Sequence, residues 1–99
     1  MTMPFVTEYL SDGVRVVLSG HVTVAEAAPL HTALLELAGT EGRVVIDESR
    51  VAGFDLSLLQ LVLAVARARR AAGRALSVVE GPVAARLDQL SLADEITAA

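Results

Sequence analysis

The chain contains no cysteine, no lysine and no tryptophan, and aromatic residues make up only 3% of it. Without cysteine there are no disulfides, no thiolate nucleophiles and no thiolate metal sites. The core must therefore be held by packing alone. A metal site would need carboxylates beside His21 or His31, the two imidazoles of the chain, so we expect ordinary structural or surface histidines and no metal.

A membrane-spanning run is also missing. The longest apolar stretch, Leu56 to Ala66, is interrupted by Ser57 and Gln60 and is shorter than the roughly 18 to 20 residues that cross a bilayer. Residues 1–9 lack a basic segment followed by a hydrophobic one, so they do not form a secretory signal. We therefore expect a cytoplasmic protein with no membrane span.

Excess positive charge is lacking as well. The net charge is −4 and the pI is near 5.0, which argues against a nucleic-acid partner because such proteins carry clustered basic residues. All eight basic residues are arginines. The cluster of Arg67, Arg69, Arg70 and Arg74 is predicted to be a solvated helix end that complements the helix dipole, with an anion or partner site as the alternative.

Enzyme motifs are absent from the sequence. It has no G-x-G-x-x-G, no P-loop and no H-E-x-x-H. Ser57, His21 and Asp55 could be combined on paper into a catalytic triad, but no glycines of a nucleophile elbow flank the serine. We expect no enzymatic activity and no cofactor.

What is present is enough for one small domain, residues 1–99, since 54% of the residues are hydrophobic. Two runs rich in β-branched residues, Phe5–Leu10 and Val14–Leu18, flank Ser11-Asp12-Gly13. An Asp-Gly pair between such runs predicts a β-hairpin. Alternate residues of the second strand, Val14, Val16 and Leu18, are expected on one face.

A first helix is predicted after this hairpin. Thr23 and Glu26 have the spacing of a capping box, and Gly39 is a plausible stop. Pro29 is comfortable only in a first turn, so the regular helix is expected to begin nearer Glu26. Leucines recur at helical spacing on one face: Leu30, Leu34 and Leu37.

The middle of the chain predicts a buried strand and a long helix. Residues Arg43 to Asp47 form the strand, with Asp47 at its C-terminal end. Ser57 is the expected N-cap and Gly73 the expected glycine after the helix, so the helix should cover Leu58 to Ala72.

A last strand, Ala75 to Glu80, is followed by Gly81-Pro82, which predicts the start of a last helix. Its apolar side chains are Val83, Leu87 and Leu90. The order β-β-α-β-α-β-α predicts an α/β fold, with a mixed four-stranded sheet covered by about three to four helices.

The long helix has more apolar surface than one sheet can cover. A helix lying on a sheet needs an apolar stripe about 100° wide, and a wider set is present: Leu58, Leu59, Leu61, Val62, Leu63 and Val65. Either the last helix covers the remainder, or a partner protein or a second copy of the chain does.

The order of these segments resembles the STAS domain, the family of sulfate transporters and anti-sigma factor antagonists. Leu18-Ser19-Gly20-His21-Val22 is similar to the family's L-x-G-E-L, and Val44-Val45-Ile46-Asp47 is followed eight residues later by Asp55. The long helix ends at Ala72-Gly73, and the segment Leu87 to Asp94 resembles the closing L-x-x-x-G-L-x-D. The resemblance implies the STAS fold and a non-enzymatic regulatory role, with Asp47 and Asp55 as hydrogen-bond acceptors that order loops.

The phosphorylation motif of the family is altered. Members that are phosphorylated carry D-S-S-G-L or D-T-S-G-L, and the first hydroxyl residue accepts the phosphate from a partner kinase. Here the aligned residues are Asp55-Leu56-Ser57-Leu58-Leu59, so Leu56 replaces the phosphoacceptor and Leu58 the glycine. Ser57 is left as the candidate for phosphorylation. A leucine cannot take the charge of a phosphate and offers a permanent apolar contact, which predicts constitutive binding.

The resemblance also implies a surface for partner binding, formed by Asp55, Leu56, Ser57, Leu58 and Leu61. The expected partner is an anti-sigma factor kinase or a chemotaxis-type signalling protein. The alternative is a place as accessory subunit of a membrane lipid-transport complex, docked on its ATPase subunit. A homodimer could coexist with either.

Overall fold

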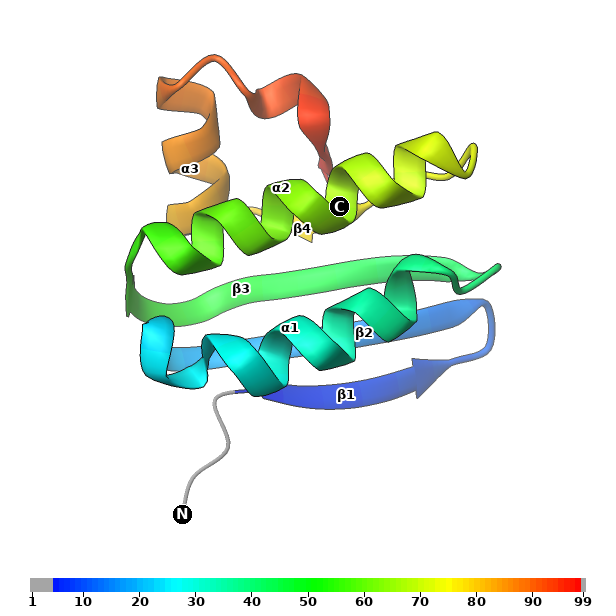
Figure 1. Ribbon diagram of the computed structural model, residues 1–99, viewed down its shortest axis with the longest axis horizontal. Coiled ribbons are helices and arrows are strands. Elements are labelled where there is room, and N and C mark those ends of the chain that lie inside the picture. Colours follow the sequence, from blue (N-terminus) through cyan, green and yellow to red (C-terminus); the bar gives the residue numbers. More distant parts are fainter. Residues whose placement is uncertain (1–4, 99) are drawn as a thin grey trace.

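The structure is a computed structural model that describes residues 5–98, apart from the side chains of residues 24–27 and 98. Its secondary structure follows the predicted order, with a short 3-10 helix, η1, and a final strand added at the end (Figure 1). The elements are β1 (Phe5–Leu10), β2 (Gly13–Val22), α1 (Val24–Ala38), β3 (Arg43–Phe54), α2 (Leu56–Ala71), β4 (Ser77–Val79), α3 (Pro82–Gln89), η1 (Ala93–Glu95) and β5 (Thr97–Ala98).

One mixed sheet organises the fold, in the order β1-β2-β3-β4-β5. β1 and β2 form the predicted antiparallel hairpin, and the remaining neighbours pair in parallel. The predicted mixed α/β fold is confirmed. β5 extends the four expected strands at one edge, and its two residues are too few for a periodic pattern to reveal it.

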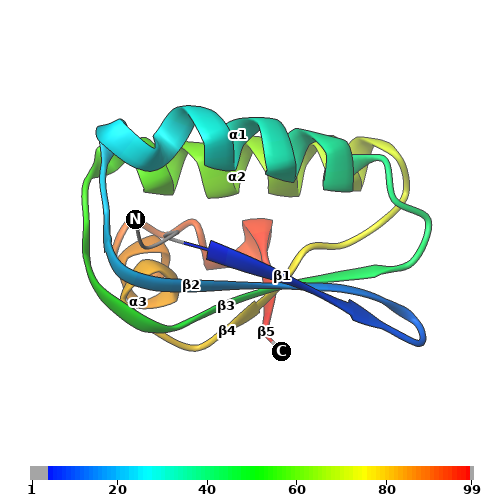
Figure 2. The same ribbon diagram turned by 90° about the horizontal axis from the view of Figure 1, so that it is seen from below.

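The helices lie mainly on one side of this sheet. α1 and α2 run side by side over one face, and α3 lies at the end of the molecule where α2 begins (Figures 1 and 2). The face beneath them is apolar as predicted, since Val14, Val16 and Leu18 are buried. Parallel pairing of β2 with β3 places Val44 and Ile46 beside these valines, so both strands contribute to the same core.

Several boundaries differ from the prediction, and those of β3 and α1 differ for reasons that the packing explains. β3 has 12 residues and continues to Phe54, so Asp47 lies within the strand and not at its end. α1 begins at Val24 and continues through Pro29, because Leu30 and Leu34 beyond the proline are fully buried and their packing favours the helix over the local preference. Thr23 precedes the helix as predicted, whereas the side chain of Glu26 lies outside the described residues.

Arg69 corrects the prediction of a solvated arginine cluster, because this residue is only 2% exposed. Its guanidinium donates hydrogen bonds to four backbone carbonyls, those of Ala75 at 2.7 Å, Leu37 at 3.2 Å, Thr40 at 3.0 Å and Gly42 at 3.0 Å. Burial lowers the pKa of Arg69. The side chain thus joins the end of α2 to the loop between α1 and β3, where carbonyls at the end of α1 stabilise a positive charge.

Of the neighbouring arginines, Arg67 and Arg70 are exposed and reach η1, whereas Arg74 is half-buried. Arg67 and Arg70 both lie within ion-pair distance of the Glu95 carboxylate, at 3.7 Å and 3.3 Å. This difference in exposure follows from helix geometry, since Arg69 points to the core while residues on either side of it point to solvent. These pairs hold η1 against α2.

Candidate functional site

Asp55 shapes the start of α2, which the sequence singled out as the docking region. This residue has extended backbone, and its carboxylate accepts a hydrogen bond from the Ser57 N–H at 3.0 Å. Asp55 is therefore the N-cap, and the expectation that Ser57 caps the helix is wrong. The helix begins at Leu56, two residues earlier than predicted, because an aspartate between a strand and a helix reaches the free N–H groups as well as a serine does.

The five residues of the predicted partner-binding surface divide into two groups. Leu56 is 62% exposed, and Asp55 and Ser57 are half-buried. Leu58 and Leu61 are only 1% and 5% exposed and belong to the hydrophobic core. The prediction that Leu58 presents a docking contact is corrected by its burial. Leu58 follows Leu56 by two residues, a rotation of about 200° around the helix, so it lies on the opposite side and faces inward.

The wide apolar stripe of α2 is covered by other elements of the same chain. α1 packs along α2 on one side, and η1 contacts it on another. Five of the six apolar residues counted in the sequence are buried and Leu63 is half-buried. Leu56, which lies outside that stripe, is the leucine of α2 that projects into solvent.

A shallow groove lies between α1 and α2, and it includes Ser57, the neighbour of Leu56 in the chain. Its volume is about 400 Å³. The residues that line it are Ala28, His31, Ser57, Gln60, Leu61 and Ala64. The buried Leu61 therefore contributes its edge to the groove, and two of the predicted partner-binding residues, Ser57 and Leu61, meet there. Sequence reasoning missed the contribution of α1, because nothing local relates His31 to Ser57.

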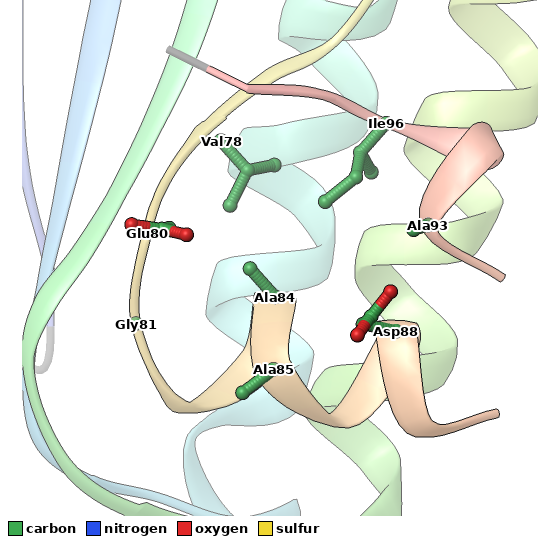
Figure 3. Close-up of a pocket in the computed structure, with 8 residues that line it drawn as sticks. All are labelled: Val78, Glu80, Gly81, Ala84, Ala85, Asp88, Ala93 and Ile96. Atoms are coloured by element: carbon green, nitrogen blue, oxygen red, sulfur yellow. The ribbon is translucent and has the colours of Figure 1, made fainter. Parts of the chain in front are cut away.

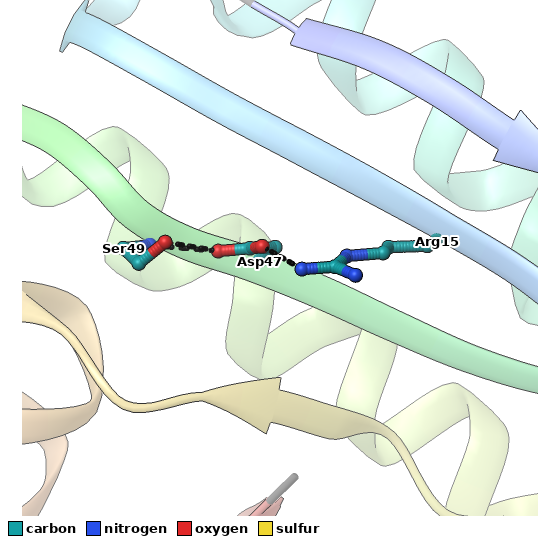
Figure 4. Close-up of polar contacts among 3 residues, drawn as sticks. All are labelled: Arg15, Asp47 and Ser49. Carbon is teal, nitrogen blue, oxygen red and sulfur yellow. Dashed lines mark hydrogen bonds and ion pairs between the residues drawn. The ribbon is translucent and has the colours of Figure 1, made fainter.

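Asp47 belongs to a separate polar cluster on the sheet, not to the docking region. Its carboxylate accepts hydrogen bonds from the Ser49 hydroxyl at 2.6 Å and the Ser49 N–H at 3.0 Å, and it pairs with Arg15 of β2 (Figure 4). These contacts, first the Ser49 hydroxyl and then Arg15, lower the pKa of Asp47 to about 2. Its predicted role as an acceptor holds, but it joins two strands rather than ordering a loop.

The described residues offer no ready metal centre. No group of three or more histidine, aspartate or glutamate side chains gathers among them in a way that could hold an ion. Both histidines are exposed, and the His21 ring lies against Gly53. Within the same described part of the chain, no helix has the length and hydropathy required to cross a bilayer.

Comparison with known proteins agrees with this architecture. The family model described as "Mlab, STAS domain" matches residues 7–96. The chain therefore belongs to the STAS domain family, as its sequence motifs indicated. No curated protein sequence matches it.

Solved structures show the same fold at low sequence identity. The phosphorylated form of the Bacillus cell fate determinant SpoIIAA superposes with a TM-score of 0.78 at 18% identity, over 96% of this chain and 90% of that one. The unphosphorylated anti-sigma factor antagonist SpoIIAA gives a TM-score of 0.67 at 22% identity, over 87% and 82%. A Shewanella loihica protein with a SpoIIAA-like fold gives 0.55 at 14% identity, over 88% and 75%.

Proposed function

We propose that this chain is a non-enzymatic regulatory module that binds a partner protein through the start of α2. The docking surface consists of Asp55, Leu56 and Ser57 together with the groove between α1 and α2. The observation that carries the proposal is Leu56, which is 62% exposed at the first position of α2 and precedes Ser57 of that groove in the chain. Fully burying a leucine contributes about 1.5–3 kcal/mol, so this side chain can anchor an interface.

The proposed surface combines the projecting Leu56 side chain with the groove between α1 and α2. A partner that covers Leu56 can insert an apolar side chain of its own above Leu61 and Ala64, while His31 and Gln60 at the margin provide polar groups. Interfaces commonly have such an apolar centre with a polar rim. Leu56 and the groove together therefore form the proposed centre of the interface, and the polar groups of His31 and Gln60 set its specificity.

We further propose that binding is constitutive. Leu56 occupies the position that is a phosphoacceptor in regulated members of the family, and a leucine carries no hydroxyl. Ser57 is the remaining candidate for phosphorylation, and its place in the first turn of α2 would bring a phosphate close to free N–H groups. Its hydroxyl is not needed as the helix cap, because Asp55 fills that role.

The partner that we favour is an anti-sigma factor kinase or a chemotaxis-type signalling protein. The likeness of the fold to an anti-sigma factor antagonist supports this choice. The second candidate is the ATPase subunit of a lipid-transport complex. The exposed Leu56 favours it as well, because an apolar contact that cannot be switched by phosphate suits a permanent subunit.

The experiment is affinity purification of the tagged protein from its native cells, compared with Leu56→Asp. We expect the mutant to lose the partner, because an aspartate would bring a charge into the centre of the interface. Its circular dichroism spectrum should not change, since an acidic residue in the first turn suits a helix. Leu35→Asp is the matched control, since Leu35 is 47% exposed on α1, and it should retain the partner.

The identity of the lost protein decides between the candidates. A kinase or other signalling protein supports the first, and an ATPase with its permease supports the second. A partner retained equally by wild type and Leu56→Asp contradicts the docking surface. Light scattering of the purified chain tests the homodimer separately.

A further inference from the structure

A second hollow lies on the other side of α3, away from the groove between α1 and α2. Its volume is about 640 Å³, within the range of roughly 300–1,000 Å³ typical of ligand sites. The end of β4, the length of α3 and the segment from η1 to β5 enclose it. The lining residues are Val78, Glu80, Gly81, Ala84, Ala85, Asp88, Ala93 and Ile96.

Part of the lining of this hollow is apolar. Val78, Ala84 and Ile96 point toward one another across it (Figure 3). Val78 is buried, and Ala84 and Ile96 are half-buried. The small alanines of α3 leave the space open, because larger side chains at those positions would fill it. A hydrocarbon chain would find van der Waals contact on these surfaces.

The charged groups of the lining are both acidic. Glu80 and Asp88 lie on opposite sides of the hollow (Figure 3), and neither has an ion pair within the described part of the chain. The arginine ion pairs found there go elsewhere, to Asp12, Asp47 and Glu95. Arg86, the basic residue in the same turn as Asp88, donates a hydrogen bond to Gln89 at 3.1 Å. The two carboxylates of the hollow therefore have no ion-pair partner among the described residues.

The position of Asp88 strengthens the negative electrostatic potential at the hollow. It lies in the last turn of α3, which is the negative end of the helix dipole. A carboxylate at that end disfavours the helix, and a bound cation would relieve the repulsion. Phosphate or another anion would be repelled for the same reason.

We propose that this hollow binds an organic cation, namely an alkyl guanidinium or alkyl ammonium group. The charged end pairs with Glu80 or Asp88, and the hydrocarbon chain lies on Val78, Ala84 and Ile96. A bare metal ion fits poorly, because the described residues place no third histidine or carboxylate ligand within a metal site. The inference is independent of the docking surface at α2. Two sources share this chemistry: a free amine, and an arginine side chain of a protein segment.

The test is a titration of the ¹⁵N-labelled full chain at constant salt, followed by the NMR shifts of the backbone amides. The probes are agmatine, N-acetyl-arginine-N-methylamide and the neutral N-butylurea. We expect both guanidinium compounds to shift Gly81, Ala84, Ala85 and Ala93, and N-butylurea to leave them unchanged. Tighter binding of agmatine assigns the hollow to a free amine, and tighter binding of the blocked arginine assigns it to a protein segment.

Two sets of variants make the test specific. Glu80→Gln with Asp88→Asn should weaken binding about tenfold or more, because charge-assisted hydrogen bonds are lost. Glu36→Gln with Glu41→Gln is the matched control, since it changes the net charge equally at exposed positions outside the hollow and should bind as the wild type does. Ala85→Phe should reduce binding by filling the space without changing the charge.

Three results would overturn the proposal. The first is the absence of shifts at the hollow with either guanidinium compound at millimolar concentration. The second is equal binding by Glu80→Gln with Asp88→Asn and by its control. The third is an equal response to N-butylurea. Retention of the native amide spectrum in each variant shows that the comparison is between folded proteins.

Discussion

At the scale of single residues, charged side chains that bond to backbone groups decide how neighbouring segments meet. Asp55 caps α2, and Arg69 donates to carbonyls in the loop after α2 and in the loop between α1 and β3. Arg69 looks like an ordinary surface charge in the sequence, whereas Asp55 was expected to accept hydrogen bonds within a loop. Their partners are unpaired backbone groups at helix and strand ends, which need hydrogen bonds once they are buried.

Arg69 is expected to be essential for stability. Arg69→Met would leave the carbonyls of Leu37, Thr40, Gly42 and Ala75 without their donor. Buried polar groups that lose their partners cost about 1–3 kcal/mol, so we expect a loss of about 3 kcal/mol in the free energy of unfolding. Arg69→Lys should also destabilise the protein, because an ammonium group cannot reproduce the planar, forked arrangement of N–H donors in a guanidinium. Urea denaturation measures both.

Arg67→Met is the matched control for this prediction. Arg67 is exposed and its contact with Glu95 spans 3.7 Å, so the expected change is at most about 1 kcal/mol. An Arg69→Met protein as stable as Arg67→Met would show that the carbonyl contacts do not contribute.

At the scale of elements, a buried carboxylate fixes the position of α3. Glu48 of β3 is fully buried and accepts hydrogen bonds from the N–H groups of Val83 at 2.5 Å and Ala84 at 2.6 Å. It caps α3 from a distant strand, where Gly81 has no side chain to do so. The glycine is required for another reason: a Cβ there would lie 2.8 Å from the Glu48 carboxylate.

Glu48→Ala is predicted to loosen α3. Loss of a cap costs about 0.5–2 kcal/mol, and the buried N–H groups add to that cost; we expect about 2 kcal/mol by urea denaturation. Amide hydrogen exchange should rise first in α3, because its remaining contacts with the chain are few and local unfolding follows weak packing. Glu36→Ala, at an exposed position of α1, is the control. Exchange that rises uniformly over the chain would contradict a role confined to α3.

At the scale of the whole molecule, the pairing of β2 with β3 makes stability depend on pH. The pKa of Asp47 is lowered from its ordinary 3.8 to about 2, so its ionised form is favoured by folding. This contribution is fully present above about pH 4 and is lost as the pH falls toward 2. Glu48 acts in the opposite direction, because burial raises its pKa.

Asp47→Asn is expected to reduce this dependence. Its free energy of unfolding should be lower than that of the wild type by roughly 2 kcal/mol at pH 6, because the shift in pKa is nearly two units. The difference should shrink when urea denaturation is repeated near pH 2, where the Asp47 carboxyl is protonated in the unfolded chain and about half protonated in the folded protein. Asp12→Asn removes an exposed pair with Arg43 and should change stability little. A difference that is constant with pH would contradict the prediction.

The sequence by itself determined the class of fold, and it led to the proposal that the start of α2 is a docking surface. Alternation of valines in β2 and the Asp-Gly turn predicted the hairpin, and Gly73 predicted the end of α2; it has a positive φ of 76° there. Such signals are local, since a strand, a turn or a helix end depends on neighbours within a few residues.

Only the tertiary structure decided which side chains of α2 face solvent. Leu56 and Leu58 differ little in the sequence, yet one is exposed and the other is buried, because α1 and the sheet cover particular sides of the helix. The groove, the hollow beside α3 and the caps by Glu48 and Arg69 all join residues far apart in the chain. Long-range packing creates these contacts, so a local sequence pattern does not predict them.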